Sequence, residues 1–174
     1  RADIAAMFLP EFSRENERDG GGERQPEALH CRAVSAAAGA LKPTSFSPIA
    51  AGHGAIGWTY AAQQPLCMND PQQDERFDAQ VDAPAGFSLQ NLMAAPLIMR
   101  GRTVGVLMAA NKRGGRFGDV DQELFTSLAS AVSRALENAS LFQSVRTRQQ
   151  ELQESHNRLQ AVMNGILNPI YTCL

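Results

Sequence analysis

The sequence predicts an α/β (α+β) protein in which an antiparallel sheet is followed by one long helix. Two observations predict the sheet: a pair of apolar runs around the turn at 100–102, and a second pair of apolar runs at 2–9 and 28–39. The third observation is a helical pattern that runs from Asp119 to Leu167. We therefore expect a globular domain at 1–141, a coiled-coil helix at 142–167 and the start of a downstream domain at 168–174.

The composition is that of an ordinary globular domain with an extension. The chain has 174 residues, 44% hydrophobic and 20% charged, with a formal net charge of -2. This charge gives no general attraction to nucleic acid or to an anionic membrane, so we predict neither partner. The three cysteines are too few and too scattered for a disulfide framework, which favours a reducing, cytoplasmic location. The chain begins with Arg1 and not Met, and we expect it to be a piece of a larger protein.

The first two strands are predicted to form a hairpin with a long loop. The loop holds three consecutive glycines, and the second strand alternates so that Cys31, Ala33 and Ser35 share one face and Arg32 and Val34 the other. Next come a short helix at 55–62 and a short strand at 65–69. The segment 70–91, which is rich in Asp, Gln and Pro, is expected to be irregular and to act as a lid.

The hairpin at 92–111 is predicted to lie in the middle of the sheet, because both of its faces are apolar. Val106, Met108 and Ala110 point to one side, while Leu107 and Ala109 point to the other. We expect helices to cover one face and a loop-roofed cavity to lie on the other.

The C-terminal half of the helical pattern becomes a heptad repeat, which predicts a parallel dimeric coiled coil. Gln149 and His156 are polar positions within it that would set the register, and His156 would respond to mild acid unless it lies in solvent. The predicted dimer seam consists of Phe142, Val145, Gln149, Leu152, His156, Leu159, Met163 and Ile166.

The stretch "NKRGGRFGDVDQELF" at 111–125 is predicted to join the sheet to the long helix. It lacks the Gly-Lys-Ser/Thr spacing of a phosphate-binding loop, so that function is excluded. Gly118 or Asp119 is placed to cap the helix, with an acceptor side chain three residues later. Lys112 then has a carboxylate within reach at Asp121, which predicts a clasp between strand and helix.

These segments together resemble a GAF domain, from Ala2 to about Phe142. The resemblance rests on "GHGAIGWTYAAQQPLCMND", "DERFDAQVD", the hairpin, "FGDVDQELF" and the Asn111, Lys112, Phe117 and Asp121 series, which is similar to that of cyclic-nucleotide-regulated members. It implies a six-stranded antiparallel sheet, a helical layer on one face, a small-molecule pocket on the other, and regulation of an attached output instead of catalysis. The tail "LQAVMNGILNPIYTCL" resembles the helix entering a PAS domain, which implies a multidomain bacterial sensor such as a histidine kinase.

The ligand is left open by the residues. Cyclic-nucleotide binders of this family carry an aromatic-acid pair where this chain has Ala36 and Ala37, although Ser35 is close enough to substitute. The lid lacks the cysteine and histidine that bilin-binding relatives use. A haem would need His53, His30 or Cys67 as axial ligand, and a metal site at Cys31, His30 and Cys67 lacks paired spacing.

An enzymatic function is not predicted. Relatives that reduce free methionine sulfoxide carry a cysteine where this chain has Ile56, and without that nucleophile the reaction has no first step. We predict no cofactor and no metal, and a pocket for an unknown small molecule lined by Ser35, Ile56, Trp58, Met68, Phe77, Phe87 and Leu92. The alternatives are a ligand-free dimerisation module and a cyclic-nucleotide-binding domain.

Overall fold

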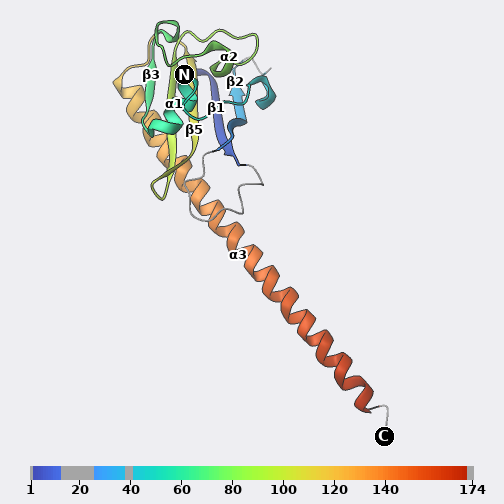
Figure 1. The fold of residues 1–174 in the computed structure, drawn as a ribbon. Helices are drawn as coiled ribbons and strands as arrows, with labels where there is room; N and C mark the ends of the chain where they lie inside the picture. The colour runs from blue at the N-terminus through green and yellow to red at the C-terminus, as the bar shows by residue number, and fades with distance from the viewer. Residues whose placement is uncertain (1, 13–25, 38–40, 172–174) are drawn as a thin grey trace. The chain divides into compact units, whose positions relative to one another are not determined.

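The structure is a computed structural model that describes residues 2–12, 26–37 and 41–171. One antiparallel sheet has the strand order β2-β1-β5-β4-β3 (Figure 1). Its strands are β1 (Ala2–Glu11), β2 (Ala28–Ala36), β3 (Leu66–Met68), β4 (Leu92–Met99) and β5 (Arg102–Lys112). The helices are α1 (Gly54–Ala62), α2 (Ala79–Asp82) and α3 (Asp119–Tyr171), with two short 3-10 turns, η2 (Pro43–Ser45) and η3 (Pro71–Gln73).

The sheet has five strands in the described residues, where six were expected. Beyond β2 the chain makes a single bridge, in which Leu29 and Ile49 exchange both backbone hydrogen bonds at 2.7 and 3.0 Å. In the described residues the pairing of this part of the chain is limited to that one bridge.

One face of the sheet carries the main hydrophobic core. Val106, Met108 and Ala110 of β5 lie on this face, as the alternation predicts, and are fully buried. Helix α1 packs over them with Ala55 and Ile56, both of which are 0% exposed. The first of the predicted helices is thus part of the core itself.

The predicted alternation of β2 is wrong beyond Cys31. The register pairs Phe8 with Cys31 and then Met7 with Ala33, so Arg32 is an extra residue in a β-bulge. The bulge shifts the following residues by one, which brings Val34 to the core face. Ser35, opposite Ala5, therefore lies on the other face and is exposed.

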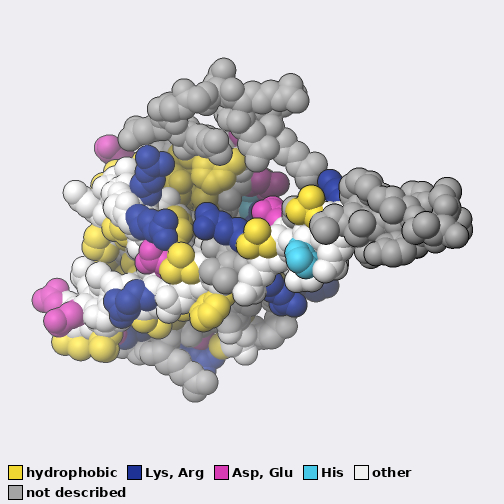
Figure 2. All heavy atoms as spheres, turned by 90° about the horizontal axis from the view of Figure 1, so that it is seen from below, with side chains coloured by type: hydrophobic (Ala, Val, Ile, Leu, Met, Phe, Trp, Pro, Cys, Tyr) yellow, Lys and Arg dark blue, Asp and Glu magenta, His cyan; other side chains and the backbone are white. Residues whose placement is uncertain are grey.

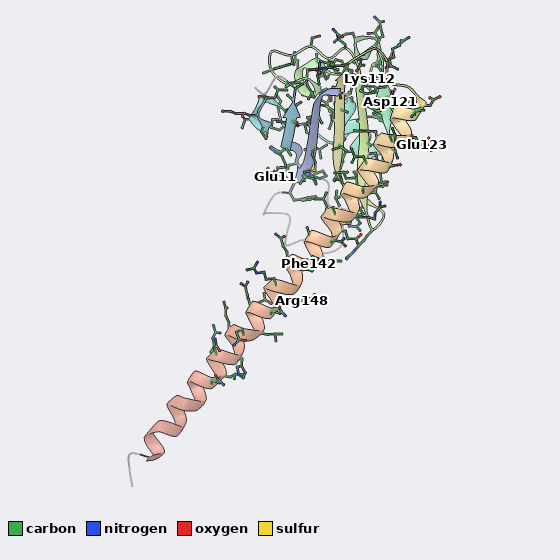
Figure 3. All side chains as sticks on the ribbon, turned by 180° about the vertical axis from the view of Figure 1, so that it is seen from behind. Glu11, Lys112, Asp121, Glu123, Phe142 and Arg148 are labelled. Atoms are coloured by element: carbon green, nitrogen blue, oxygen red, sulfur yellow. The ribbon has the colours of Figure 1, made fainter. Side chains whose placement is uncertain are left out.

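The opposite face of the sheet is covered in part by the first turns of α3, which lie across it in Figures 1 and 3. Met93, Ala95, Leu97 and Ala109 point to this side and are buried. Phe125, Ala129 and Ser133 are the buried residues of these turns. Their spacing of four places them on one side of the helix.

The chain divides into two compact units, 1–133 and 134–174, and α3 contributes to both. Helix α3 begins at Asp119, where the pattern predicts it, and ends at Tyr171. It thus includes residues 168–171 of the segment predicted to begin a downstream domain, and residues 172–174 of that segment lie outside the described residues. Among the described helices, none combines the length and the apolar character that a bilayer span requires. On the face shown in Figure 2, basic, acidic and hydrophobic side chains are interspersed.

Candidate functional site

A hollow beside the lid, which we call the α1 hollow, lies at the start of α1 and has a volume of about 450 Å³. Two of the residues predicted for a ligand pocket, Trp58 of α1 and Phe77 of the lid, line this hollow, and both are partly buried against the core. Most of the other lining groups are polar or charged. The lining residues are Gly52, His53, Gly54, Trp58, Gln72, Glu75, Arg76, Phe77, Asp78 and Ala79.

The other five residues predicted for the pocket do not line this hollow. Ile56, Met68 and Leu92 are 0%, 3% and 0% exposed and belong to the hydrophobic core. Ser35 lies on the opposite face of the sheet because of the bulge in β2. Phe87 is 37% exposed and lies outside the lining of the hollow. These core side chains fill the space between α1 and the sheet. The sequence does not distinguish the two cases, because an apolar residue suits a core position as well as a pocket wall.

Arg76 forms the cationic wall of the hollow. Its guanidinium lies over the Trp58 ring, 4.8 Å from the ring centroid, a distance typical of a cation–π contact. Asp74 holds the same guanidinium by two bonds, with Nε donating to Oδ1 at 2.8 Å and Nη2 to Oδ2 at 2.6 Å. This hydrogen bonding by Arg76 lowers the pKa of Asp74 from its ordinary value. The charge of Arg76 is thus already matched within the lid.

His53 and Asp78 face each other at the rim of the hollow. The distance from His53 Nε2 to Asp78 Oδ2 is 3.0 Å, and the histidine side chain is 58% exposed. Asp78 also caps α2, because its Oδ1 accepts a hydrogen bond from the backbone N–H of Gln80 at 2.8 Å. The contact ties the residue before α1 to the residue before α2.

Asp82 is the sole fully buried acidic residue in the described part of the chain. Its carboxylate lies at the start of α1 and accepts three backbone hydrogen bonds: Oδ2 from Ala55 at 2.7 Å and from Asp78 at 2.9 Å, and Oδ1 from Ile56 at 3.1 Å. Burial raises the pKa of Asp82, while the three N–H donors pull it down. Sequence reasoning missed this residue, because nothing local separates it from the other acids of the lid.

The first residue of α1 is a glycine, which leaves room for this carboxylate. Gly54 has a φ of +66°, and a Cβ built on it would lie 2.8 Å from both oxygens of Asp82. Any side chain at this position would collide with the carboxylate and would also strain the backbone. The position of the Asp82 carboxylate therefore requires a glycine at residue 54.

The predicted clasp residues come together at the start of α3, where Figure 3 labels Lys112 and Asp121 side by side. Lys112 Nζ donates to Asp121 Oδ2 at 2.6 Å and to the carbonyl of Arg116 at 3.1 Å. Asp121 also accepts from the backbone N–H of Gly118 at 2.8 Å, which makes Gly118 the cap. The Gly118 N–H first, and then Lys112, lower the pKa of Asp121.

Three asparagines fasten the loops around this clasp, and two of them were not predicted. Asn69 donates to the carbonyl of Phe117 at 3.0 Å and accepts from its N–H at 2.7 Å. Asn91 accepts from the N–H of Lys112 at 2.7 Å, and the predicted Asn111 bonds both Ser88 and Gln90. An asparagine next to an apolar strand was the available signal, because Asn69 follows β3 and Asn91 precedes β4. The amide of asparagine can satisfy both a backbone donor and a backbone acceptor.

Comparison with known proteins identifies the family. The family model for the GAF domain matches residues 1–136. The chain belongs to the GAF domain family. Its fold is similar to that of the GAF domain of a phosphoenolpyruvate-protein phosphotransferase from Coxiella burnetii, with a TM-score of 0.62 and 14% identity over 82% of this chain and 76% of that one. The GAF-B domain of DevS from Mycobacterium smegmatis gives a TM-score of 0.58 and 20% identity over 83% and 86% of the two chains.

Sequence relatives of this GAF domain include two phosphodiesterases. A probable 3′,5′-cyclic phosphodiesterase, pde-5 of Caenorhabditis elegans, is 30% identical over 98 residues, which are 56% of this chain and 14% of the relative. The dual 3′,5′-cyclic-AMP and -GMP phosphodiesterase 11 of Drosophila melanogaster is 30% identical over 97 residues, 55% of this chain and 7% of the relative. The matched segments are thus small parts of much longer proteins.

The cysteines of the GAF domain that the structure describes lie in surroundings that disfavour a thiolate. Burial raises the pKa of the Cys31 thiol to about 11. Burial, and then the carboxylates of Asp121 and Asp119, raise the pKa of Cys67. A thiol must ionise to act as a nucleophile, so neither side chain is activated for such chemistry.

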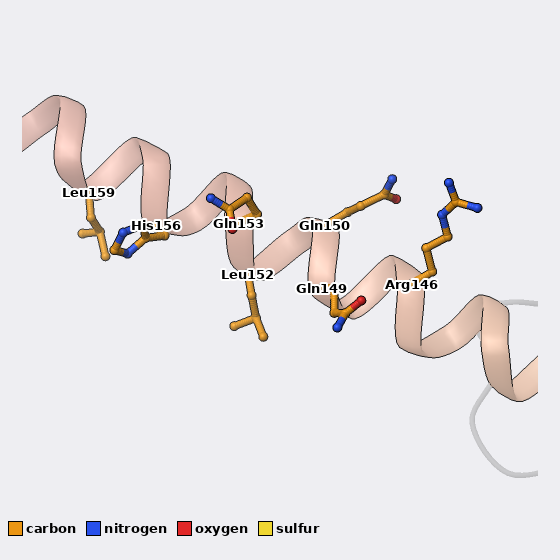
Figure 4. A pocket seen from close by; sticks show the side chains of 7 residues that line it. All are labelled: Arg146, Gln149, Gln150, Leu152, Gln153, His156 and Leu159. Carbon is orange, nitrogen blue, oxygen red and sulfur yellow. The ribbon is translucent and has the colours of Figure 1, made fainter.

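The described part of the dimer seam lies in the second unit, on α3. Figure 4 shows Gln149, Leu152, His156 and Leu159 projecting to one side of the helix, while Gln150 projects away from them. Leu152 is 71% and Leu159 is 61% exposed, and Phe142 is 78% exposed. The side chains of Val145, Met163 and Ile166 lie outside the described residues.

Proposed function

We propose that this GAF domain is the small-molecule-sensing, regulatory part of a multidomain bacterial signalling protein, a sensor histidine kinase in type, and that it regulates instead of catalysing. In this proposal the ligand binds in the α1 hollow. The signal passes through α3, which pairs in parallel with the same helix of a second copy and leads to a downstream domain of PAS type. The protein acts in the cytoplasm.

The observation that carries the proposal is the continuity of α3 between the clasp and the seam. The helix begins at Asp119, where Lys112 and Asp121 join it to the sheet at 2.6 Å, and it continues to Tyr171. In the second unit of the chain, Phe142, Leu152 and Leu159 of α3 lie at seam positions of the heptad repeat, and each is more than half exposed. Such side chains favour a partner helix, because exposed Leu and Phe at these intervals bury their surface when two such helices pair.

The lining of the α1 hollow favours it as the site of a small ligand. It offers one aromatic wall at Trp58 and Phe77 and several polar groups from the lid, the mixture of surfaces that fixes a small molecule in a pocket. Ligand binding would therefore contact both α1 and the lid.

The sensing function is tested by thermal unfolding with a panel of neutral, cationic and anionic small molecules. A ligand at about 100 times its dissociation constant adds about 2.7 kcal/mol of stability. Trp58→Ala should abolish the shift that an active compound produces in the wild type, whereas Phe87→Ala, in the lid but outside the hollow, should retain it. No saturable shift with any compound would leave the ligand-free dimerisation module as the better proposal.

The seam is tested by sedimentation. Leu152→Lys with Leu159→Lys introduces two charges on the predicted seam, and we expect it to halve the mass of the particle. The matched control is Gln150→Lys with Asn157→Lys, which adds the same charges at two exposed positions of another heptad row and should leave the mass unchanged. An unchanged mass in both variants would exclude a dimer held by this helix.

Two alternatives are favoured by separate observations. The filling of the space under α1 by Ile56, Met68 and Leu92 favours a GAF domain that binds nothing and serves to dimerise. The two phosphodiesterase relatives favour cyclic nucleotide as ligand. Cyclic AMP and cyclic GMP therefore belong in the panel, and a saturable shift with one of them would decide between these alternatives.

A further inference from the structure

We propose that the α1 hollow takes a small organic cation, whose charged head replaces the guanidinium of Arg76 on the ring of Trp58. The inference names the ligand class of that hollow and so rests on the proposed sensing function. Three observations carry it: an aromatic ring that already holds a cation, carboxylates that line the same hollow, and a guanidinium whose charge is matched elsewhere.

The ring of Trp58 is a surface for a positive charge. The guanidinium carbon of Arg76 lies 4.8 Å from the ring centroid, within the ~6 Å over which the negative face of an aromatic ring attracts a cation. Tryptophan is the best of the aromatic side chains in this role. Phe77 gives the same hollow a second aromatic wall. Aromatic walls of this kind bind quaternary ammonium groups, which cannot donate hydrogen bonds.

Arg76 occupies this ring without depending on it. Its Nε and Nη2 donate to Asp74 at 2.8 and 2.6 Å, and its backbone N–H donates to the same carboxylate at 3.0 Å. Its side chain is 39% exposed, so the guanidinium can leave the ring for water while it keeps its carboxylate partner. A cation–π contact at an exposed site contributes little free energy. A ligand cation therefore displaces Arg76 from the ring at small cost.

The carboxylates of the lining select a positive charge. Glu75 and Asp78 both line the hollow, and neither is the ion-pair partner of Arg76. Asp78 faces His53 at 3.0 Å, whereas Glu75 has no hydrogen bond or ion pair within the part of the chain that the structure describes. A cation on the Trp58 ring gains attraction from Glu75 as well as from the ring. A neutral molecule of the same shape gains neither.

The fluorescence of Trp58 tests the inference directly, because this residue is the single tryptophan of the chain. Choline carries a trimethylammonium head, and its neutral analogue is the dimethylbutanol that has carbon in place of the nitrogen. At constant ionic strength we expect choline to change the fluorescence of the wild type saturably, and the neutral alcohol to bind at least about 5-fold more weakly. Equal affinities would overturn the proposal, since they would show binding by apolar contact alone.

Three variants separate the roles of the charged groups. Arg76→Ala removes the competing guanidinium and should tighten choline binding about 2- to 5-fold. Glu75→Gln removes the attracting charge and should weaken choline binding. Glu123→Gln makes the same change at an exposed position of α3 outside the hollow and should leave the affinity unchanged. An unchanged affinity in Arg76→Ala, or equal losses in the two glutamine variants, would overturn the proposal.

Failure of this inference and failure of the sensing function give different results. Neutral or anionic compounds of the panel may produce a thermal shift that Trp58→Ala abolishes, while choline changes nothing in the wild type or in Arg76→Ala. That result would overturn the cation as ligand and leave the sensing function standing. If no compound gives a saturable response, cations included, both proposals fail together.

Discussion

Replacing Ile56 by alanine tests whether this residue is core or pocket. The side chain was predicted to line a ligand pocket, yet in the structure it is 0% exposed and belongs to the core between α1 and the sheet. A residue lining an empty pocket loses few contacts when it is shortened. A packed core residue loses its contacts and leaves a void.

The expected cost follows from this burial. Shortening isoleucine to alanine removes apolar groups equivalent to about three methylenes, at ~0.8 kcal/mol each when fully buried. The void that remains adds to this transfer cost, which brings the total to about 2 to 5 kcal/mol. Ile98 of β4 provides the matched control, because it is the same residue type but 42% exposed. We expect Ile98→Ala to cost less than about 1 kcal/mol.

Urea denaturation followed by circular dichroism measures both variants against the wild type. The midpoint should shift strongly for Ile56→Ala and little for Ile98→Ala, with unchanged slopes that show a common unfolded state. Equal small costs for the two variants would refute the assignment of Ile56 to the core and would restore it to the pocket lining.

Three further predictions concern a carboxylate, the thiols and a pair of glycines. The pKa of Asp121 is lowered, so its stabilising contribution is present above the unfolded pKa of about 3.9 and is lost as the pH falls through the folded pKa. The difference in unfolding free energy between the wild type and Asp121→Asn should therefore be constant from about pH 7 to 5 and shrink below about pH 4. A difference that does not depend on pH would contradict the clasp. In a Cys173→Ser background, Cys31 and Cys67 should react with a disulfide reagent at pH 8 more than about 10-fold slower than after unfolding in urea, because burial raises both pKa values. Equal rates would show that the fold does not protect these thiols. Gly52 and Gly54 have φ of +84° and +66°, but only at Gly54 does a Cβ meet Asp82; by thermal melts Gly52→Ala should cost about 1 to 2 kcal/mol and Gly54→Ala clearly more, and equal costs would remove the crowding.

The parts of the fold that depend on regular periodicity could be predicted from the sequence. Both faces of the hairpin β4–β5 are apolar, and the alternation of Val106, Met108 and Ala110 places them on the core face as expected. The start of α3 at Asp119 also follows from its local pattern. In both cases the signal repeats over many residues, so a single exception does not change the result.

The parts that depend on one residue or on distant contacts could not be predicted. A single bulge at Arg32 reverses the alternation of β2 and moves Ser35 to the wrong face for the pocket. Ile56, Met68 and Leu92 have the same composition whether they face a ligand or each other, and tertiary packing decides between the two. Asp82 meets Ala55 across 27 positions of sequence, and no local pattern announces such a contact.

Asn69 gives the domain a short mechanical path between the lid and the long helix. It is the last residue before the lid, and its amide holds both backbone groups of Phe117, two residues before α3 begins. A displacement of the lid that turned this one amide would break two hydrogen bonds at once and free the chain that sets the direction of the first turn. Asn69→Asp removes the donor of one of these two bonds without touching the α1 hollow, and we expect thermal unfolding to show a loss of stability from this change alone.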